Sequence, residues 1–361
     1  MTFALLFSAF ASYLLLRFNS VHQHLSGDYD LTGPQKFHTS ITPRIGGISI
    51  YLSFLTTLYI FKLDDNSPYF REHLILCSIP VFGIGLIEDI HKHIYVRTRI
   101  LITAMSALIA ILLLGVNITT VDIKIFDWFL SYPWIAILFT IFAVTGLTNS
   151  YNIIDGFHGL SSMTAIITLL ALSYVSHING DYQLSALCLT LAASIGGFFI
   201  FNFPHGLIFL GDGGAYLIGF MIAELSILLS NRQPEISPWF IFLVNLYPIT
   251  ETIFSIYRRF KRKLSPGMPD GIHFHTLIYR RIVKHKFHTE HTSQALSPNA
   301  KTSPYLWVLT LLAVLPAVCF WKSTPTLVFF SCSFVFLYVW LYLCIIHYKT
   351  PRWLSFANSK K

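Results

Sequence analysis

Residues 149–160, with the sequence NSYNIIDGFHGL, form a polar segment with two glycines between two apolar runs, 133–149 and 159–177. Each run is long enough for an α-helix that crosses a bilayer, which takes about 17–25 residues. Amide, carboxylate and imidazole groups are costly to hold at the edge of a membrane unless they are hydrogen-bonded or bind a ligand. The segment therefore predicts a helical membrane protein with a reactive site where two of its helices end at the membrane surface.

The composition of the whole chain is that of a membrane protein. Of its 361 residues, 54% are hydrophobic and only 12% are charged, and the mean hydropathy is +0.61. The same length rule predicts about eleven transmembrane helices along the chain. They cover residues 2–18, 45–62, 73–89, 99–117, 133–149, 159–177, 184–203, 213–230, 238–258, 304–320 and 325–347. The predicted fold class is therefore an all-α polytopic membrane protein.

The helices are predicted to form a single membrane domain over residues 1–361. The first apolar run has no basic region before it and no small-residue cleavage site, so we expect it to remain as a helix. The polar segment 288–303 contains a proline and predicts a flexible cytoplasmic link before the last two spans, 304–347.

Lysine and arginine are distributed unevenly between the two faces that this topology defines. With an external N-terminus, 20 of the 25 Lys and Arg residues fall on one face and five on the other. Basic residues near span ends are retained on the cytoplasmic side. The pattern thus predicts a periplasmic N-terminus and a cytoplasmic C-terminus.

The same topology places every unusual polar cluster on the cytoplasmic face. The clusters precede the second span and follow the third, fifth, seventh and ninth, at Thr42–Gly47, Gly85–Asp89, Asn149–Leu160, Gly211–Gly214 and Asp270–Arg281. Loops that converge on one side of a helical bundle predict one active site, which faces the cytoplasm.

The charged residues of these loops are of two kinds. The hard oxygen donors, which suit Mg²⁺ or Mn²⁺, are Glu88, Asp89, Asp155 and Asp212. The cations, of which arginine pairs especially well with phosphate oxygens, are Arg44, His273, His275, Arg280 and Arg281. Glycines that allow a backbone to approach a bulky anion stand at Gly46, Gly47, Gly213 and Gly214. Together they predict metal-assisted phosphoryl transfer, with no nucleic acid as partner.

These motifs resemble those of the polyprenyl-phosphate N-acetylhexosamine-1-phosphate transferases and occur in the same order along the chain. The resemblance covers roughly residues 36–281. That family includes the undecaprenyl-phosphate GlcNAc-1-phosphate transferases and the phospho-N-acetylmuramoyl-pentapeptide transferase of peptidoglycan synthesis. The resemblance implies a multi-pass enzyme of the bacterial inner membrane with a Mg²⁺ site. Its substrates would be a UDP-N-acetylhexosamine and undecaprenyl phosphate within the membrane lipid, and UMP would be released. A homodimer is also compatible with the resemblance.

The resemblance also implies roles for individual residues. Asp212 and Asn152 match the metal-binding positions, and Asp155 matches the Asp of an Asn-x-x-Asp-Gly signature that binds or orients the nucleotide sugar. Asp89 with Glu88 matches the paired acidic motif that handles the lipid phosphate or acts as base. His273 and His275 match the family's histidine loop, which resembles a diphosphate clamp. Because of their charge, Arg44 and Arg280 are also expected substrate-binding positions, as is Gly213 because glycine allows close approach of the backbone.

Three positions depart from the family pattern. Glu88 replaces the usual aspartate, His158 stands where many members have a second aspartate, and Thr276 replaces the third histidine of a His-x-His-His loop. The missing histidine favours the branch that initiates O-antigen or other surface polysaccharides. The muramoyl-pentapeptide enzyme remains the alternative, and no role is assigned to His158.

Two other classes of protein stay open. Glu224 and Glu251 lie within predicted spans, as the acidic residues of a lipid or ion transporter would. A transporter would also show an internal repeat, and none is found in the sequence. A metallohydrolase of isoprenyl diphosphates would share the metal and the basic loops but release inorganic phosphate in place of UMP.

Overall fold

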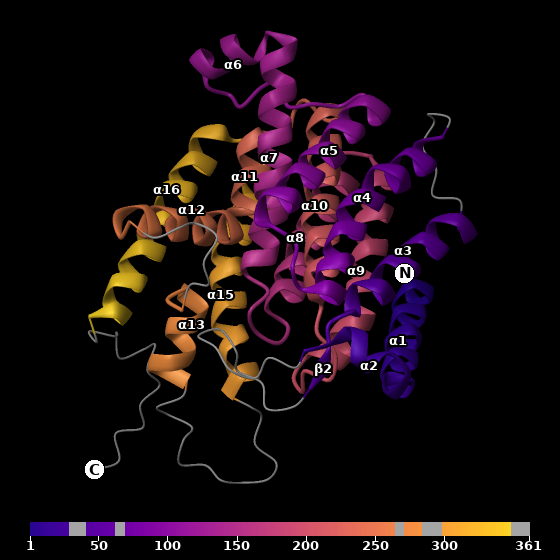
Figure 1. Ribbon diagram of the computed structural model, residues 1–361. Coiled ribbons are helices and arrows are strands. Elements are labelled where there is room, and N and C mark those ends of the chain that lie inside the picture. The colour runs from indigo at the N-terminus through magenta and orange to yellow at the C-terminus, as the bar shows by residue number, and fades with distance from the viewer. Residues whose placement is uncertain (29–40, 62–68, 264–270, 284–297, 348–361) are drawn as a thin grey trace.

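The structure is a computed structural model that describes residues 1–28, 41–61, 69–263, 271–283 and 298–347. Lys36, Asp270 and residues 288–297 of the expected link lie outside the described residues. The described chain is almost entirely helical, as predicted, and its helices form one bundle (Figure 1). One short antiparallel pairing joins β1 to β2.

Helices at least fifteen residues long make up most of the bundle. They are α1 (Thr2–Arg17), α3 (Gly46–Ile60), α4 (Phe70–His91), α5 (Val96–Leu114), α7 (Pro133–Ile153), α8 (Leu160–Ile178), α9 (Tyr182–Asn202), α10 (Gly211–Arg232), α12 (Leu246–Lys261), α15 (Pro298–Cys319) and α16 (Thr324–Ile346). The shorter elements are α2 (Asn19–Ser26), β1 (Gly27–Asp28), β2 (Thr42–Pro43), α6 (Lys124–Leu130), α11 (Pro238–Val244), α13 (Phe274–Ile278) and the π-helical turn η1 (Tyr279–Val283).

The protein is a multi-pass membrane protein. Within the described residues, eight helices are long and apolar enough to cross a membrane, or up to ten if each of two bent pairs is one span. The bent pairs are α1 with α2, at 86°, and α11 with α12, at 72°. Helix α3 is apolar but has only 15 residues. The count of eleven crossings stays a prediction.

The expectation of one helix over residues 238–258 is wrong, because the chain turns sharply at Asn245 between α11 and α12. Pro248 explains the break: its ring clashes with the carbonyl four residues earlier, and it has no N–H to donate. That carbonyl belongs to Val244 and accepts a hydrogen bond from the Thr168 hydroxyl at 3.1 Å. The polar group that the proline releases is therefore satisfied by a neighbouring helix.

The expected link at 288–303 is also corrected where the structure describes it. Helix α15 begins at Pro298, so residues 298–303 are helical and not a flexible connection. Asn299, Thr302 and Ser303 are buried there against the rest of the bundle. The polar composition of this stretch reflects contacts inside the protein, since its side chains satisfy backbone groups of the segment between α7 and α8.

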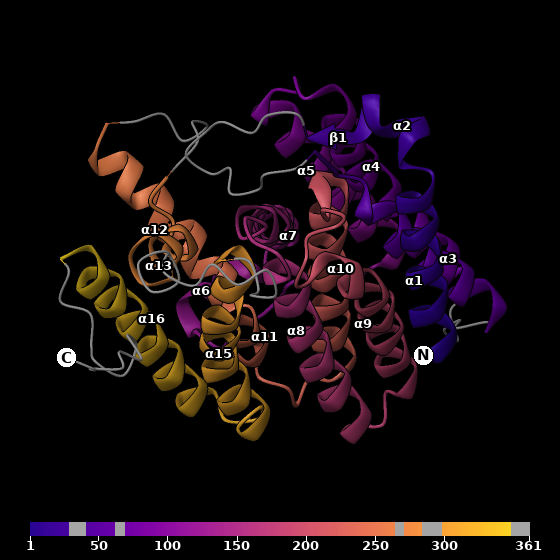
Figure 2. The same cartoon turned by 90° about the horizontal axis from the view of Figure 1, so that it is seen from below.

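Helix α10 is the centre of the bundle and is buried along nearly its whole length (Figure 2). Glycines let its first turns meet two neighbours at backbone distance. A Cβ on Gly47 of α3 would lie 2.4 Å from the nitrogen of Gly214, and one on Gly85 of α4 would lie 2.6 Å from the Cα of Gly213. Small residues at helix contacts are the usual means of close packing in membranes. These contacts place α4 and α10 so that their polar ends meet.

Two glycines of α4 provide a matched test of this packing. In Gly85→Ala the new methyl group would meet backbone atoms of Asp212 and Gly213, whereas a Cβ on Gly83 would have nothing within 4 Å. We expect Gly85→Ala to cost about 1–3 kcal/mol through overpacking and to lower the thermal unfolding midpoint of the purified protein in detergent. Gly83→Ala should leave that midpoint unchanged or raise it. Equal midpoints for the two variants would refute the close contact.

Candidate functional site

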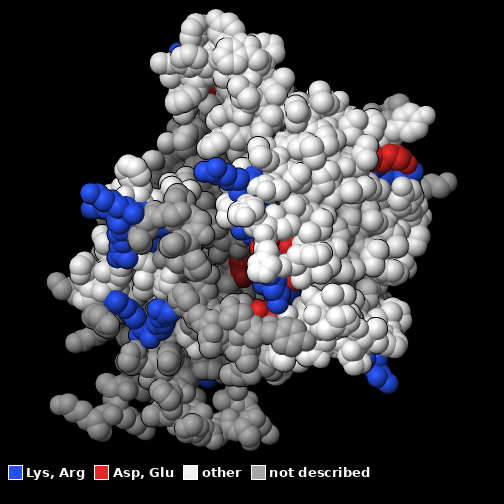
Figure 3. Space-filling view, viewed as in Figure 1, with Lys and Arg blue, Asp and Glu red and all other residues white. Residues whose placement is uncertain are grey.

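A cavity of about 920 Å³ opens where the polar ends of α5, α7, α10 and α12 meet. Its wall includes the loop between α7 and α8, the segment that leads into α10, and the start of α13. On the viewed face, acidic and basic side chains gather in a hollow within a largely uncharged surface (Figure 3). The cavity therefore combines most of the polar clusters that the sequence analysis expected to converge.

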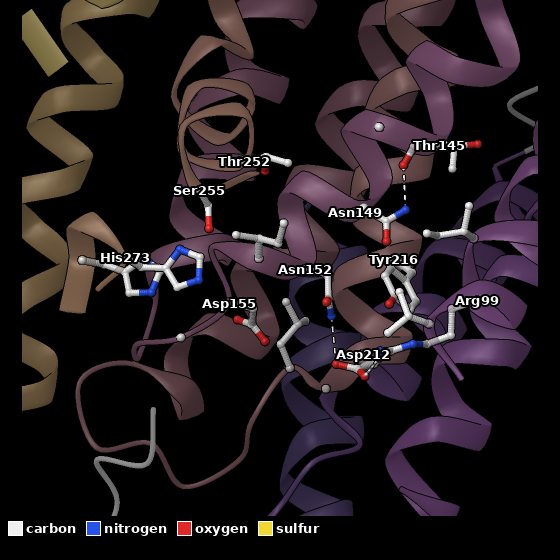
Figure 4. A pocket seen from close by; sticks show the side chains of 18 of the residues that line it. Arg99, Thr145, Asn149, Asn152, Asp155, Asp212, Tyr216, Thr252, Ser255 and His273 are labelled. Atoms are coloured by element: carbon white, nitrogen blue, oxygen red, sulfur yellow. Dashed lines mark hydrogen bonds and ion pairs between the residues drawn. The ribbon is translucent and has the colours of Figure 1, made fainter. Parts of the chain in front are cut away.

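Asp212, at the start of α10, is the hub of the charged groups. Its Oδ1 accepts a hydrogen bond from the Asn152 amide at 2.8 Å and lies 3.5 Å from the guanidinium of Arg44. Its Oδ2 accepts from Arg99 at 3.3 Å. Figure 4 shows Asn152 above Asp212 and Arg99 beside it. One carboxylate thus connects the ends of α5, α7 and α10 with the segment before α3.

Asp89, near the end of α4, is almost fully buried and serves the backbone of α10. Its two oxygens accept hydrogen bonds from the N–H groups of Asp212, at 2.8 Å, and Gly213, at 2.9 Å. Arg44 lies 3.5 Å from the same carboxylate. The first N–H groups of a helix have no partner within the helix and carry positive potential. Asp89 therefore fixes the start of α10, and with it Asp212.

Burial and neighbouring charges shift the pKa values of Arg44 and Asp155. Burial lowers the pKa of Arg44, but the carboxylates of Asp212 and Asp89 more than offset this effect, so the pKa is raised overall. Withdrawal from water raises the pKa of Asp155 to about 7; Asp212 adds to the rise and Arg44 opposes it. Asp155 thus lines the cavity with a pKa close to neutral pH, so its carboxyl group can accept or release a proton there.

Glu88 precedes Asp89 near the end of α4 but contacts different partners. Its Oε2 accepts a hydrogen bond from the backbone N–H of Ile94 at 2.9 Å, and its Oε1 lies 3.7 Å from Arg99. Glu88 therefore closes the turn between α4 and α5 and shares Arg99 with Asp212. It does not line the cavity.

His273 and His275 form the opposite wall of the cavity. Their rings are nearly parallel, with centroids 5.1 Å apart. His273 is hydrogen-bonded through Nδ1 to Glu251 of α12 at 2.9 Å. His275 packs edge-on against Phe157, in the loop that follows α7. In Figure 4, Asp155 lies between the His273 wall and Asp212.

The loop between α7 and α8 is held by side chains from distant parts of the chain. Asn299 accepts from the N–H of His158 at 2.9 Å, and Ser303 donates to the carbonyl of His158 at 2.6 Å. Asn202 accepts from the N–H of Gly159 at 2.6 Å. The His158 ring itself lies over Phe209 and lines the cavity. The loop is thus rigidly placed although it belongs to no helix.

The donor set fits a hard divalent cation. Asp212 brings a carboxylate, Asn152 beside it carries an amide oxygen as well as the NH₂ group that donates to Asp212, and Asp155 lines the same cavity. The described residues contain no group of three or more His, Cys, Asp or Glu residues arranged to hold a metal. Mg²⁺ commonly takes one or two carboxylates and completes its shell with water and substrate phosphates. A site with few protein ligands beside arginine and histidine side chains fits this kind of coordination.

A sequence model of the family described as glycosyl transferase family 4 matches residues 73–230, which include Asp89, Asn152, Asp155 and Asp212. Over this segment the chain is similar to that family. It is 29% identical to an undecaprenyl-phosphate alpha-N-acetylglucosaminyl 1-phosphate transferase of Thermotoga maritima, over 78% of this chain and 83% of that protein. The Escherichia coli K12 protein of the same name is 28% identical, over 68% and 67%. A probable undecaprenyl-phosphate N-acetylglucosaminyl 1-phosphate transferase of Bacillus subtilis is 26% identical, over 69% of each chain.

Most of the predicted site residues come together, but not all of them reach the cavity. The cavity wall contains Arg44, Asn152, Asp155, Asp212, His273 and His275. Glu88, Asp89 and Gly213 lie directly behind that wall. Arg280 is exposed on η1 and does not line the cavity. The substrate-binding role of Arg280 stays a prediction without support from its position.

The N–H groups of three of these glycines are engaged in contacts within the protein. The N–H groups of Gly46 and Gly47 donate to the carbonyls of Phe209 and Leu210, at 2.9 Å each. The N–H of Gly213 is taken by Asp89. The expectation that these backbones turn toward a bulky anion is therefore replaced by close contact between α3, α4 and α10.

Sequence reasoning missed several residues of the site. Arg99 contacts Asp212, and its signal was its place in the first turn of a helix that directly follows an acidic pair. Asn202 is a lone amide at the end of an apolar helix, a pattern that could have marked it. Asn299 had no usable signal, because it lies 141 residues from its partner His158.

Proposed function

We propose that this protein transfers N-acetylglucosamine 1-phosphate from its UDP-sugar to undecaprenyl phosphate, with release of UMP. The names of the similar proteins support the reaction. The cavity is the observation on which the proposal depends. One part of its wall carries Asp212, arginines and histidines, and another part is apolar. A phosphorylated lipid and a nucleotide sugar need both kinds of surface in one place.

The apolar wall is suited to the lipid acceptor. It is formed by α5 and α7, which contribute Val96, Ile100, Ala104, Leu138, Ile141 and Phe142. Leu138 and Phe142 are 60% and 73% exposed on the bundle surface that would face lipid. An isoprenyl chain that lies along this wall would bring its phosphate to Arg44 and Arg99, whose side chains reach Asp212.

The proposed reaction joins an oxygen of undecaprenyl phosphate to the β-phosphorus of the UDP-sugar, and the bond to the UMP oxygen breaks. Arg44 and Arg99 hold the lipid phosphate, and His273 and His275 hold the diphosphate from the opposite wall. Asp155, with its raised pKa, can accept a proton from the attacking phosphate. The buried carboxylate of Asp89 keeps Asp212 in position.

Asp212 and Asn152 would hold Mg²⁺ or Mn²⁺, with Asp155 nearby. The bound cation would supply neutralisation of the charge that develops on the diphosphate. The oxygen-only donor set supports this assignment, as does the small number of protein ligands.

The proposal extends to the setting of the enzyme. The chain would cross the bacterial inner membrane eleven times. The excess of basic residues on one face supports an orientation with the N-terminus in the periplasm and the C-terminus in the cytoplasm. The site would then face the cytoplasm, where nucleotide sugars are made. The lipid-linked product would initiate O-antigen or another surface polysaccharide. A homodimer stays a prediction.

The decisive assay incubates purified protein with undecaprenyl phosphate and a panel of labelled UDP-sugars, with and without EDTA. We expect UMP and a lipid-linked sugar from UDP-N-acetylglucosamine, loss of both products with EDTA, and recovery with added Mg²⁺. Release of inorganic phosphate in place of UMP would identify a hydrolase. Turnover that persists in EDTA would refute the metal assignment.

A further inference from the structure

Glu251 of α12 is a fully buried carboxylate that contacts His273 of the cavity wall and has partners from two other elements. Its Oε1 accepts from Nδ1 of His273 at 2.9 Å and from the N–H of Phe274 at 3.2 Å. Its Oε2 accepts from the hydroxyl of Tyr338, on α16, at 2.7 Å. A buried carboxylate is costly unless its oxygens are well paired. Here each oxygen is paired, and one partner is a histidine of the cavity wall.

The bond to Glu251 fixes how the His273 ring is presented. With Nδ1 engaged by the carboxylate, a ligand in the cavity meets the ring through Nε2. A carboxylate partner of this kind sets both the orientation of an imidazole and the nitrogen that faces a ligand. The parallel ring of His275 lies 5.1 Å away by centroids. Figure 4 shows His273 on the side of the cavity that faces Asp155.

The backbone beside His273 has a separate attachment. The hydroxyl of Tyr342 donates to the carbonyl of Ile272 at 3.1 Å, and Arg258 donates to both of these groups. The start of α13 is therefore tied to α12 and α16 by bonds other than the one between Glu251 and the N–H of Phe274. A variant at position 251 whose side chain keeps an oxygen can still accept from that N–H, so a change at the imidazole can be measured with the chain in place.

We propose that Glu251 is a positioning residue, which holds the His273 ring so that Nε2 addresses the diphosphate of the nucleotide sugar. Its negative charge offsets the positive charge of a doubly protonated ring, the form that can donate from both nitrogens. The inference rests on the proposed function, because the diphosphate is the ligand of that reaction. Tyr338 extends the same arrangement to α16, which lies beyond the part of the chain matched by the family model.

The test uses full-length protein in detergent with Glu251→Gln, Glu251→Asp, His273→Ala and the double variant Glu251→Gln/His273→Ala. Glu224→Gln is the control, since Glu224 is a buried glutamate of α10 that lies outside the cavity. Binding of UDP-N-acetylglucosamine and of inorganic diphosphate is measured by calorimetry, and initial rates are measured with undecaprenyl phosphate. Thermal unfolding midpoints show that each variant is folded.

We expect Glu251→Gln to weaken binding of both probes about 10-fold, the difference between a charge-assisted and a neutral hydrogen bond. The KM for UDP-N-acetylglucosamine should rise in parallel, while the KM for undecaprenyl phosphate stays constant. Glu251→Asp should restore part of the loss because it keeps the charge. In the His273→Ala background, Glu251→Gln should have no further effect, since its partner is absent.

The outcomes separate this inference from the proposed function. Equal binding by Glu251→Gln and Glu224→Gln, or losses that add in the double variant, would overturn the role of Glu251. Wild-type protein that binds diphosphate but forms no UMP would overturn the proposed function and leave the binding test valid. Wild-type protein that binds neither probe would overturn both.

Discussion

Replacement of Asp212 by alanine is expected to reduce sugar-phosphate transfer about 10²- to 10³-fold, the usual cost of removing one group that stabilises transition-state charge. Asp212 is the carboxylate on which Asn152, Arg44 and Arg99 converge. Without it, the two arginines lose their shared partner and the proposed cation loses its main ligand. The measurement is the initial rate of UMP release, with Mg²⁺ varied over a wide range.

Asp212→Asn distinguishes the two roles of this side chain. The amide can keep a hydrogen bond to Arg99 but removes the charge, so we expect activity as low as in the alanine variant and a higher requirement for Mg²⁺. Glu235→Ala is the control, because Glu235 forms an exposed pair with Lys322 beyond the other end of α10. Full activity in either Asp212 variant would remove Asp212 from the mechanism.

Asp89→Asn is expected to cost about 3–5 kcal/mol of stability, the range for breaking a buried charge interaction. Both oxygens of Asp89 accept backbone N–H groups at the start of α10. An amide offers only one oxygen, so its NH₂ group would face a backbone N–H. The thermal unfolding midpoint in detergent should fall, and activity should fall with it because Asp212 loses its support.

Glu88→Gln supplies the comparison for Asp89. Glu88 is the neighbouring acid, and its Oε2 accepts from one backbone N–H, that of Ile94, which an amide oxygen can replace. We expect little change in the unfolding midpoint for Glu88→Gln. If Asp89→Asn were as stable as Glu88→Gln but inactive, Asp89 would act in the chemistry, as the family resemblance implied, and not as an anchor of α10.

Sequence patterns predicted the helical membrane fold because long apolar runs have few other solutions in a bilayer. They also predicted that Asn152, Asp155 and Asp212 would share a site, because alternating spans bring these loops to one face. The bend at Asn245 was missed although Pro248 was visible, since apolar composition was read as one continuous helix. The start of α15 was missed because polar residues that satisfy another segment look like a solvated link.

The sequence could not predict which partner each acidic side chain contacts. Glu88 and Asp89 are adjacent in sequence, yet one closes the turn before α5 and the other holds the start of α10. Glu251 looked like an isolated acid in an apolar helix, and its histidine partner lies 22 residues further on. Which partner a side chain meets depends on helix packing, and no local pattern records that.

By itself, the sequence determined that the chain is a membrane-embedded helical protein with polar loops rich in carboxylates, arginine and histidine. Those properties follow from composition and from the spacing of apolar runs, which fix how much backbone must be helical. Only the tertiary structure decided that Asp212 is the hub, that Asp89 supports it, and that Glu251 orients His273. These assignments depend on distances between groups up to 168 residues apart, which exist only once the glycines of α3, α4 and α10 have packed.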